Sequence, residues 1–238
     1  VYISNMYLSW EEKIISNFTD KSIEEMYGRG FVFTRLGKGV MNQTRSLRVD
    51  LKKFKLSSEN RRVLTKTEEL SLFAQTIPYS EYYWKIHKMG KEFYEKKFGE
   101  KTFSAQKIKE LITDKTKSNF NKLFIYKKDE KHRVSMDATR HDFVKSNIGY
   151  CIALETKNIL HYCYPFYQLS AISDKPSANT GMGMMLKAII WAKENGKKYV
   201  YLGSFQRPTD TYKLQFSGLE WFDGKQWQND LEGLKKFV

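Results

Sequence analysis

Residues 148–166 read IGYCIALETKNILHYCYPF, two apolar runs joined by the polar residues Thr156-Lys-Asn158. Short runs rich in aliphatic and aromatic residues, separated by a turn of this length, predict the two strands of a hairpin over 148–155 and 159–166. An amphipathic helix is predicted next, over 181–195, with Gly196 ending it. A hairpin followed by a helix is typical of a sheet that carries helices on its faces.

The flanking sequence extends this pattern in both directions. Apolar spacing and capping residues predict further elements at fixed places along the chain. These are strands at 70–76, 123–126 and 198–202, helices at 79–97, after Ser104 and at 209–216, and two short strands within 219–227. The order β-α-α-β-β-β-α-β-α-β-β predicts an α/β (α+β) fold with a mixed central sheet flanked by helices.

The N-terminal third contains shorter elements. A helix is expected from Thr19 or Asp20 to about residue 27, strands at 30–35 and 46–50, and a short helix capped by Ser57 or Ser58. We therefore expect a small α+β subdomain over residues 1–68 and the main domain over residues 69–238.

The net charge of +14 is the strongest feature of the composition. It is concentrated in residues 51–150, which hold 23 basic and 13 acidic residues. A basic region of this kind indicates a polyanionic partner, most often nucleic acid. A lysine-rich surface that only promotes solubility is the alternative.

No apolar run approaches the roughly 20 residues that a membrane span needs. The first ten residues lack the basic-then-apolar order of a signal peptide. The two cysteines, Cys151 and Cys163, are too few for a disulfide framework. A reduced, cytoplasmic setting is expected, and we expect a monomer.

The segment Ser177-Ala-Asn-Thr-Gly-Met-Gly-Met184 leads into the helix at 181–195. Paired glycines let the backbone approach a ligand, and the start of a helix adds a partial positive charge. The segment therefore predicts an anion or oxyanion site, with a plain strand-to-helix turn as the alternative. The candidate binding residues are Asn179, Thr180, Gly181 and Gly183.

A second pair of motifs is Tyr201-Leu-Gly-Ser-Phe205 and Tyr212-Lys-Leu-Gln-Phe216. The first would present Ser204 at the end of a strand. Tyr212 could act as a general acid or hydrogen-bond donor, and Lys213 could stabilise an oxyanion or bind a phosphate. Taken alone, the spacing favours the aromatic residues in the core and a solvated lysine.

These motifs resemble those of the aminoacyl-tRNA–protein transferases, the arginyltransferases and bacterial leucyltransferases that modify proteins with N-terminal Asp or Glu. The element order is also that of the GNAT superfamily to which these enzymes belong. Further motifs resemble the family in the order of the chain: Met26–Phe31, Ser46–Leu51 with Phe54, Ser57–Leu64, Glu69-Leu70 and Tyr162–Tyr167.

The resemblance implies a mechanism with an already activated ester. The acceptor amine attacks the ester carbonyl of an aminoacyl-tRNA, and the enzyme aligns the two and stabilises the oxyanion. It implies catalytic roles for Tyr212, Lys213 and Ser204, and substrate-binding roles for Tyr201 and Phe166. It also implies a protein or peptide acceptor, and aminoacyl-tRNA as co-substrate with no other cofactor.

Arginine binds carboxylates and phosphates through two parallel hydrogen bonds. Arg61, Arg62 and Arg48 are therefore candidates for binding an acidic acceptor or a phosphate. A solvated helix face is the alternative for Arg61 and Arg62.

Two other functions stay open, a CoA-dependent N-acyltransferase and a non-catalytic RNA-binding protein on the same scaffold. CoA-dependent GNAT enzymes open the glycine segment with Arg or Gln, and Ala178 stands at that position here. Residues 37–44 lack the cysteines that the transferase family usually carries there, so no metal site is expected. The local cluster of His132, Asp137, His141 and Asp142 is a minor alternative for a metal.

Overall fold

The N-terminal third of the chain forms a small sheet and also supplies one strand of a larger sheet. The computed structural model describes residues 8–128, 147–169 and 179–237. The small sheet is antiparallel and has the order β1-β3-β2, from Glu11–Ile14, Val40–Gln43 and Phe31–Phe33. Helix α1 (Asp20–Gly28) contacts β2, and its N-cap is Thr19, one of the two candidates, Thr19 and Asp20, that the sequence predicted.

Eight strands form the larger sheet, in the order β11-β10-β4-β9-β8-β7-β6-β5. Neighbours are antiparallel except β8 and β9, which are parallel. The strands are β4 Ser46–Asp50, β5 Leu70–Thr76, β6 Lys122–Lys128, β7 Asn147–Glu155, β8 Ile159–Tyr167, β9 Tyr199–Ser204, β10 Leu219–Phe222 and β11 Trp227–Gln228. The predicted α+β class, with a mixed central sheet flanked by helices, is therefore confirmed.

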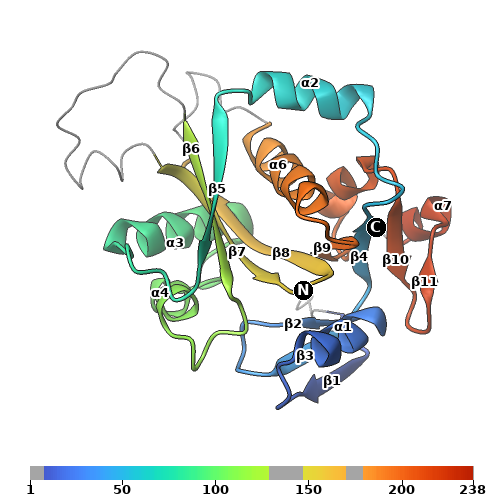
Figure 1. Cartoon of the computed structure of the whole chain (residues 1–238), viewed down its shortest axis with the longest axis horizontal. Helices are drawn as coiled ribbons and strands as arrows, with labels where there is room; N and C mark the ends of the chain where they lie inside the picture. The colour runs from blue at the N-terminus through green and yellow to red at the C-terminus, as the bar shows by residue number, and fades with distance from the viewer. Residues whose placement is uncertain (1–7, 129–146, 170–178, 238) are drawn as a thin grey trace, which may run out of the picture.

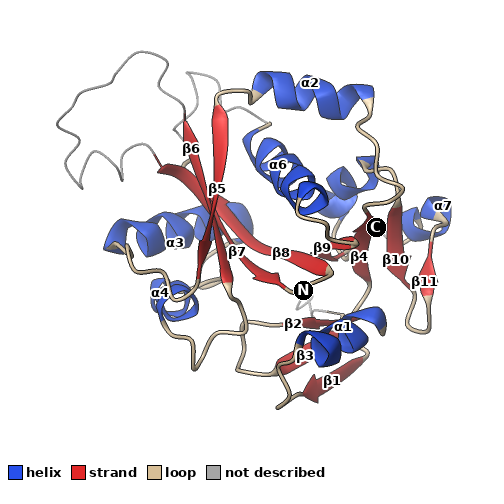
Figure 2. Ribbon diagram, viewed as in Figure 1, coloured by secondary structure: helices blue, strands red, loops and turns tan. Residues whose placement is uncertain are grey.

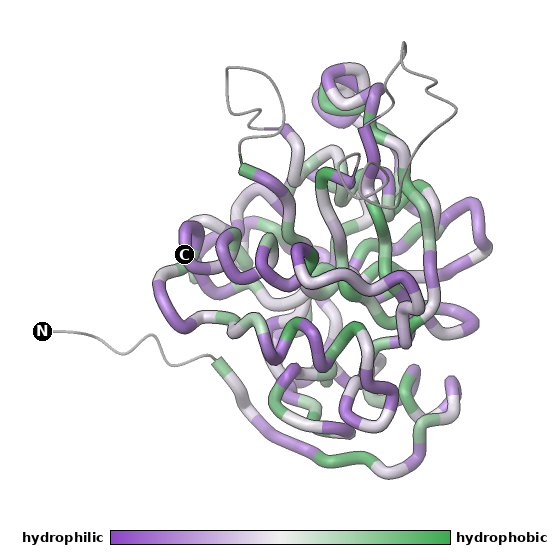
Figure 3. Tube along the Cα trace, turned by 90° about the vertical axis from the view of Figure 1, so that its left-hand side faces the viewer, coloured by the Kyte–Doolittle hydropathy of each residue, from purple (hydrophilic) through white to green (hydrophobic). Residues whose placement is uncertain are grey.

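Helices cover both faces of the larger sheet (Figures 1 and 2). α6 (Thr180–Glu194) and α2 (Ser58–Lys66) lie on one face, and α3 (Trp84–Phe98) and α4 (Ala105–Thr113) lie on the other. Each face has its own core, because successive strand residues point to opposite sides. Hydrophilic and hydrophobic residues recur at short intervals along the whole tube in Figure 3.

The C-terminal part adds the 3₁₀ helix η1 (Pro208–Gln215) and the short helix α7 (Leu231–Lys235). η1 fulfils the prediction of a short helix at 209–216. No helix within the described ranges is long and apolar enough to cross a membrane.

Helix α3 starts later than the sequence predicted. The helix expected over 79–97 begins only at Trp84. The preceding residues instead hold the chain against α4, since the Tyr79 N–H donates to the Ile112 carbonyl at 3.0 Å. Helical spacing cannot reveal this bond, because its acceptor lies far along the chain.

Strand β4 belongs to the larger sheet although it comes from the N-terminal third. Val49 lies opposite Val200 of β9 on one side and Leu219 of β10 on the other. Gly203 has a φ of +76°, which only glycine adopts readily, and the β4–β9 register shifts beside it. The boundary between residues 68 and 69 stays a prediction, and β4 ties the two predicted parts together.

Candidate active site

Strands β8 and β9 are neighbours for only part of their length. They pair from Ile159 to His161; beyond this point β8 follows β7 and β9 follows β4. Pro165 lies on the part of β8 that no longer pairs with β9, and it has no N–H that could donate a hydrogen bond to a neighbouring strand. We call this region, residues 162–167 of β8 and 202–204 of β9, the β8–β9 fork.

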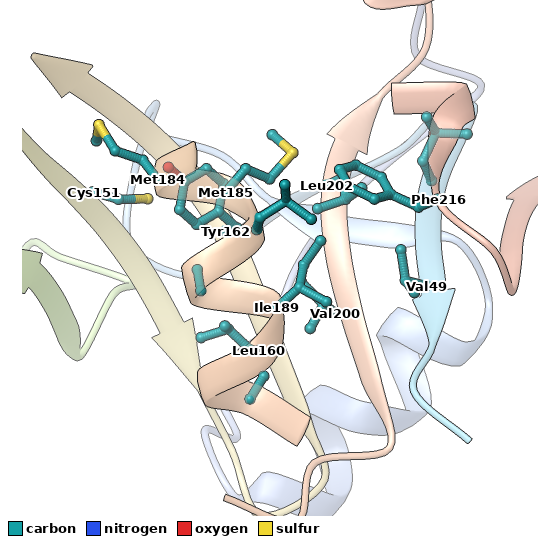
Figure 4. Packing of buried hydrophobic residues seen from close by; sticks show 14 of the residues in the cluster. Val49, Cys151, Leu160, Tyr162, Met184, Met185, Ile189, Val200, Leu202 and Phe216 are labelled. Atoms are coloured by element: carbon teal, nitrogen blue, oxygen red, sulfur yellow. The ribbon is translucent and has the colours of Figure 1, made fainter. Parts of the chain in front are cut away.

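Helix α6 packs across the two diverging strands. Figure 4 shows its Met185 and Ile189 close to Val200 and Leu202 of β9, with Tyr162 of β8 on the other side. All five side chains belong to one buried cluster. The apolar face of α6 therefore fixes the position of its first turn relative to the fork.

The first turn of α6 lies beside the end of β8. A Cβ atom on Gly181 would lie 3.1 Å from the Tyr167 hydroxyl, which is a close approach. Asn179 is the N-cap, but its side chain makes no capping hydrogen bond. Because first-turn N–H groups lack partners within their own helix, this end of α6 favours a negative charge.

Gly183 has a packing role. A Cβ atom there would lie 2.5 Å from the Thr67 hydroxyl oxygen, so glycine lets the end of α2 approach α6. Thr180 is buried. Of the predicted glycine segment, only Asn179, Thr180 and Gly181 thus remain near the fork, and Ser177 and Ala178 lie outside the described residues.

Lys213 is a buried cation in η1, with only 6% of the residue exposed. Its Nζ donates to the Ser204 carbonyl at 2.8 Å and lies 3.1 Å from Asp210 Oδ1. Burial lowers the pKa of Lys213, and the negative charge of Asp210 opposes this effect. The alternative of a solvated lysine is therefore wrong, and Lys213 is tied to the end of β9.

Asp210 organises the segment between β9 and η1. Its Oδ2 accepts the N–H groups of Gln206 at 3.0 Å and Arg207 at 3.1 Å, while its Oδ1 faces Lys213. The sequence reasoning missed Asp210. Its spacing of three residues before Lys213 in a predicted helix was the available signal.

Tyr212 is 44% exposed and neighbours the fork. Burial of the hydroxyl, the charge of Asp210 and nearby Tyr167 all raise the pKa of Tyr212. The phenol therefore stays protonated near neutral pH, where it can donate a hydrogen bond or a proton but cannot act as a base.

His161 and Cys163 of β8 lie next to this region and form a neutral pair. Cys163 Sγ is 3.4 Å from His161 Nε2 and 3.6 Å from Nδ1, and nearly equal distances place the sulfur over the ring face. Burial and the charge of Lys213 lower the pKa of His161 to about 3, and burial raises the pKa of the Cys163 thiol. This pair is therefore not a thiolate–imidazole nucleophile.

Tyr201 and Phe166 lie in the core on the face of the sheet opposite α6. Tyr201 packs edge-on against Tyr27, with ring centroids 4.9 Å apart. Phe166 lies under α3, where its ring would be 3.4 Å from a Cβ on Gly90. Their predicted substrate-binding roles stay predictions, and packing accounts for their positions.

The three predicted arginines are not brought together. Arg48 is held by Glu220 Oε2 at 2.8 Å and lies between the rings of Tyr199 and Trp227. Arg61 and Arg62 are exposed on α2, where Arg61 donates to a backbone carbonyl and Arg62 pairs with Glu59. These positions suit a structural role for Arg48 and leave only the α2 pair accessible to a ligand.

Over residues 8–128, 147–169 and 179–237, no group of three or more His, Cys, Asp or Glu side chains could hold a metal ion. The minor metal alternative at His132, Asp137, His141 and Asp142 lies outside these ranges.

Comparison with known sequences supports the resemblance seen in the motifs. No family model matches the chain. A curated relative, the aspartate/glutamate leucyltransferase of Stenotrophomonas maltophilia (strain K279a), is 32% identical over 99 residues. The match spans 39% of this chain and 38% of that protein. The chain is thus distantly similar to an aminoacyltransferase, as the motifs indicated.

Three solved structures resemble the chain weakly. L-PGS from Bacillus licheniformis has a TM-score of 0.44 at 12% identity, covering 83% of this chain and 58% of that one. FemX has a TM-score of 0.43 at 11% identity, covering 79% and 60%. A GCN5-related glucosamine N-acetyltransferase region of a fungal GH3 enzyme has a TM-score of 0.44 at 11% identity, covering 85% and 22%. At these scores we rest no argument on them.

Proposed function

We propose that this protein transfers an amino acid from aminoacyl-tRNA to the N-terminal amine of a protein or peptide, an N-degron type of modification. The similarity to a leucyltransferase supports the reaction class. The observation that carries the proposal is Lys213, a buried cation fixed at the end of β9 where β8 and β9 part. A cation held there is suited to an oxyanion.

The proposed reaction needs no acyl-enzyme. The lone pair of the acceptor amine attacks the ester carbonyl, and a C–N bond forms. The C–O bond to the tRNA ribose then breaks, and the proton lost by the amine balances the proton gained by the ribose oxygen. The neutral His161–Cys163 pair fits this scheme, because no nucleophilic side chain is required.

The protein's groups have separate roles in the proposal. Lys213 uses two of its three N–H groups on Ser204 and Asp210, which leaves one for the oxyanion. Amides of the first turn of α6 add a partial positive charge. Tyr212 supplies a proton to the leaving ribose oxygen and regains one from the attacking amine, so it ends the reaction as a neutral phenol.

A CoA-dependent N-acyltransferase is the second candidate, because the same helix start would also suit a pyrophosphate. A non-catalytic RNA-binding protein is the third. Thermal stabilisation by acetyl-CoA without stabilisation by tRNA would favour the second. Tight tRNA binding that is unaffected by Tyr212→Phe, with no transfer to any acceptor, would favour the third.

The test is transfer of radiolabelled amino acids from total charged tRNA onto peptides that begin with Asp, Glu or Ala. We expect label on one class of peptide, which names both substrates at once. Tyr212→Phe should lower this rate by about 10²-fold or more, as loss of a general acid does. The matched control is Tyr199→Phe, at the start of β9 where β8 and β9 still pair, which should leave the rate unchanged.

A further inference from the structure

The outer face of α3 carries an exposed stripe of aromatic and charged residues. Trp84, Lys88, Lys91, Glu95 and Phe98 follow one another at spacings of four, three, four and three, so they lie along one side of the helix. The opposite side, which includes Ile86 and Phe93, is buried against the sheet. We call the five exposed or half-exposed residues the α3 stripe.

The ends of the α3 stripe are two exposed aromatic rings. Trp84 is 49% exposed and Phe98 is 47% exposed. The Nζ atoms of Lys85 and Lys88 each lie 5.7 Å from the centroid of the Trp84 ring. Flat exposed rings beside lysines are the combination that binds single-stranded nucleic acid, by base stacking and phosphate contacts.

The charge around the stripe points to the same partner. Residues 84–113 contain eight lysines and four glutamates. The pairs Lys88–Glu92 at 3.7 Å and Lys91–Glu95 at 3.6 Å are solvent-exposed, so they are weak and can be exchanged for phosphate contacts. A positively charged, aromatic face is complementary to a polyanion with stacking bases.

The stripe leads to the β8–β9 fork. The guanidinium carbon of Arg207, in the segment after β9, is 5.3 Å from the Phe98 ring centroid. Phe98 also stacks with Tyr94, whose hydroxyl donates to the Pro165 carbonyl of β8 at 3.1 Å. From Trp84 to Phe98 the helix rises about 21 Å, which matches about six stacked nucleotides at roughly 3.4 Å each.

We propose that the α3 stripe binds a single RNA strand, with Trp84 as a base-stacking platform and with Lys88, Lys91 and the neighbouring Lys85 as phosphate contacts. The strand runs along α3 and ends at Phe98 and Arg207, beside the fork. The direction of the strand rests on the proposed function, since the 3′ end of a charged tRNA would have to reach the fork. The binding itself does not depend on catalysis.

The experiment measures affinity for a fluorescein-labelled single-stranded RNA ending in CCA, and for uncharged tRNA, at 50 and 200 mM salt. Trp84→Leu should weaken binding by about 5- to 150-fold, the value of one base stack. Lys88→Glu with Lys91→Glu should also weaken binding and flatten the dependence of log affinity on log salt by about 1.4. Exposed positions are chosen so that the fold survives, which thermal melting checks.

Matched controls come from the small sheet and α1. Trp10 is 40% exposed, and Lys21 is an exposed lysine on α1. Trp10→Leu and Lys21→Glu should bind both RNAs like the unmodified protein. The proposal is overturned if the Trp84→Leu and Lys88→Glu/Lys91→Glu variants bind both RNAs as tightly as the unmodified protein. It is also overturned if the control variants lose as much affinity as these variants do.

A transfer assay separates this inference from the proposed function. If the unmodified protein transfers no amino acid but the stripe variants lose RNA affinity, the α3 stripe is supported and the transferase proposal is refuted. Normal transfer from full-length charged tRNA by the same variants, at a donor concentration below its Kd, refutes the stripe and keeps the transferase proposal.

Discussion

Replacing Lys213 by Met is the change that most directly tests the role of the buried cation. The substitution keeps most of the side-chain volume but removes the charge-assisted hydrogen bond to Ser204 and the ion pair with Asp210. A hydrogen bond to a charged group contributes about 1.5–3 kcal/mol, and the Asp210 carboxylate loses a partner but keeps two N–H donors. We therefore expect a loss of about 3 kcal/mol in unfolding free energy.

For a chain of this size, about 1 kcal/mol shifts the Tm by roughly 2–4 °C, so the expected fall is about 6–12 °C. The transfer rate at saturating donor should fall by about 10²- to 10³-fold, as it does when an oxyanion donor is removed. Affinity for charged tRNA should change less than twofold, because Lys213 is buried away from phosphates. Calorimetry, single-turnover transfer and filter binding measure these three quantities.

Lys197→Met is the matched control. Lys197 also donates to a backbone carbonyl, that of Thr156 at 2.6 Å, and pairs with Glu155 at 2.7 Å, with only 9% of its side chain exposed, but it lies by the turn between β7 and β8. It should lower the Tm without lowering the transfer rate. An unchanged Tm in Lys213→Met would show that the contacts of Lys213 with Ser204 and Asp210 do not stabilise the protein. Equal losses of transfer rate and of tRNA affinity would show that Lys213 is only a phosphate ligand.

Four further substitutions test the surroundings of the site. Gly183→Ala should lower the unfolding free energy by about 1–3 kcal/mol in urea titrations, since its Cβ would lie 2.5 Å from Thr67. Gly181→Ala should cost less, since its Cβ would lie 3.1 Å from the hydroxyl and 3.2 Å from the ring edge of Tyr167. The pKa of His161 is about 3 in the folded protein and 6.5 in the unfolded chain, so the unfolded chain binds more protons between these two pH values. The unfolding free energy therefore falls as the pH drops from 6.5 to 3, by up to about 1.4 kcal/mol per pH unit. His161→Gln should remove that part of the slope, and parallel slopes would contradict the low pKa. Arg48→Lys should lower the unfolding free energy by about 1–3 kcal/mol, because lysine cannot reproduce the two hydrogen bonds of the arginine to Glu220. RNA affinity should stay unchanged. Weaker RNA binding would show that Arg48 is a phosphate ligand.

The sequence predicted those elements that have a strong local signal. Ser57 and Ser104 cap their helices as expected, because a serine hydroxyl can accept an N–H from the first turn of any helix it precedes. Strands β7 and β8 follow from long apolar runs. β1 and β3 were missed, because Glu11–Ile14 and Val40–Gln43 are short and partly polar, and only pairing makes them strands.

For the candidate site, the sequence identified residues by their type but did not reveal their burial or their contacts. The sequence singled out Lys213, yet nothing local indicates that it is buried, since Asp210 and the end of β9 create that environment together. Gly183 was assigned to a ligand, whereas its neighbour is Thr67, more than a hundred residues earlier. Such contacts depend on the tertiary fold, so no motif contains them.

The position of β4 between β9 and β10 has a consequence for synthesis of the protein. β4 ends at Asp50 and its two partners begin only at Tyr199 and Leu219, so both edges of β4 stay open while the long segment between them is made. Pairing between such distant segments is slow, and open strand edges invite aggregation. A chain cut before Leu219 would keep one edge of β4 open, so the yield of folded protein depends on β10 as well as on β9.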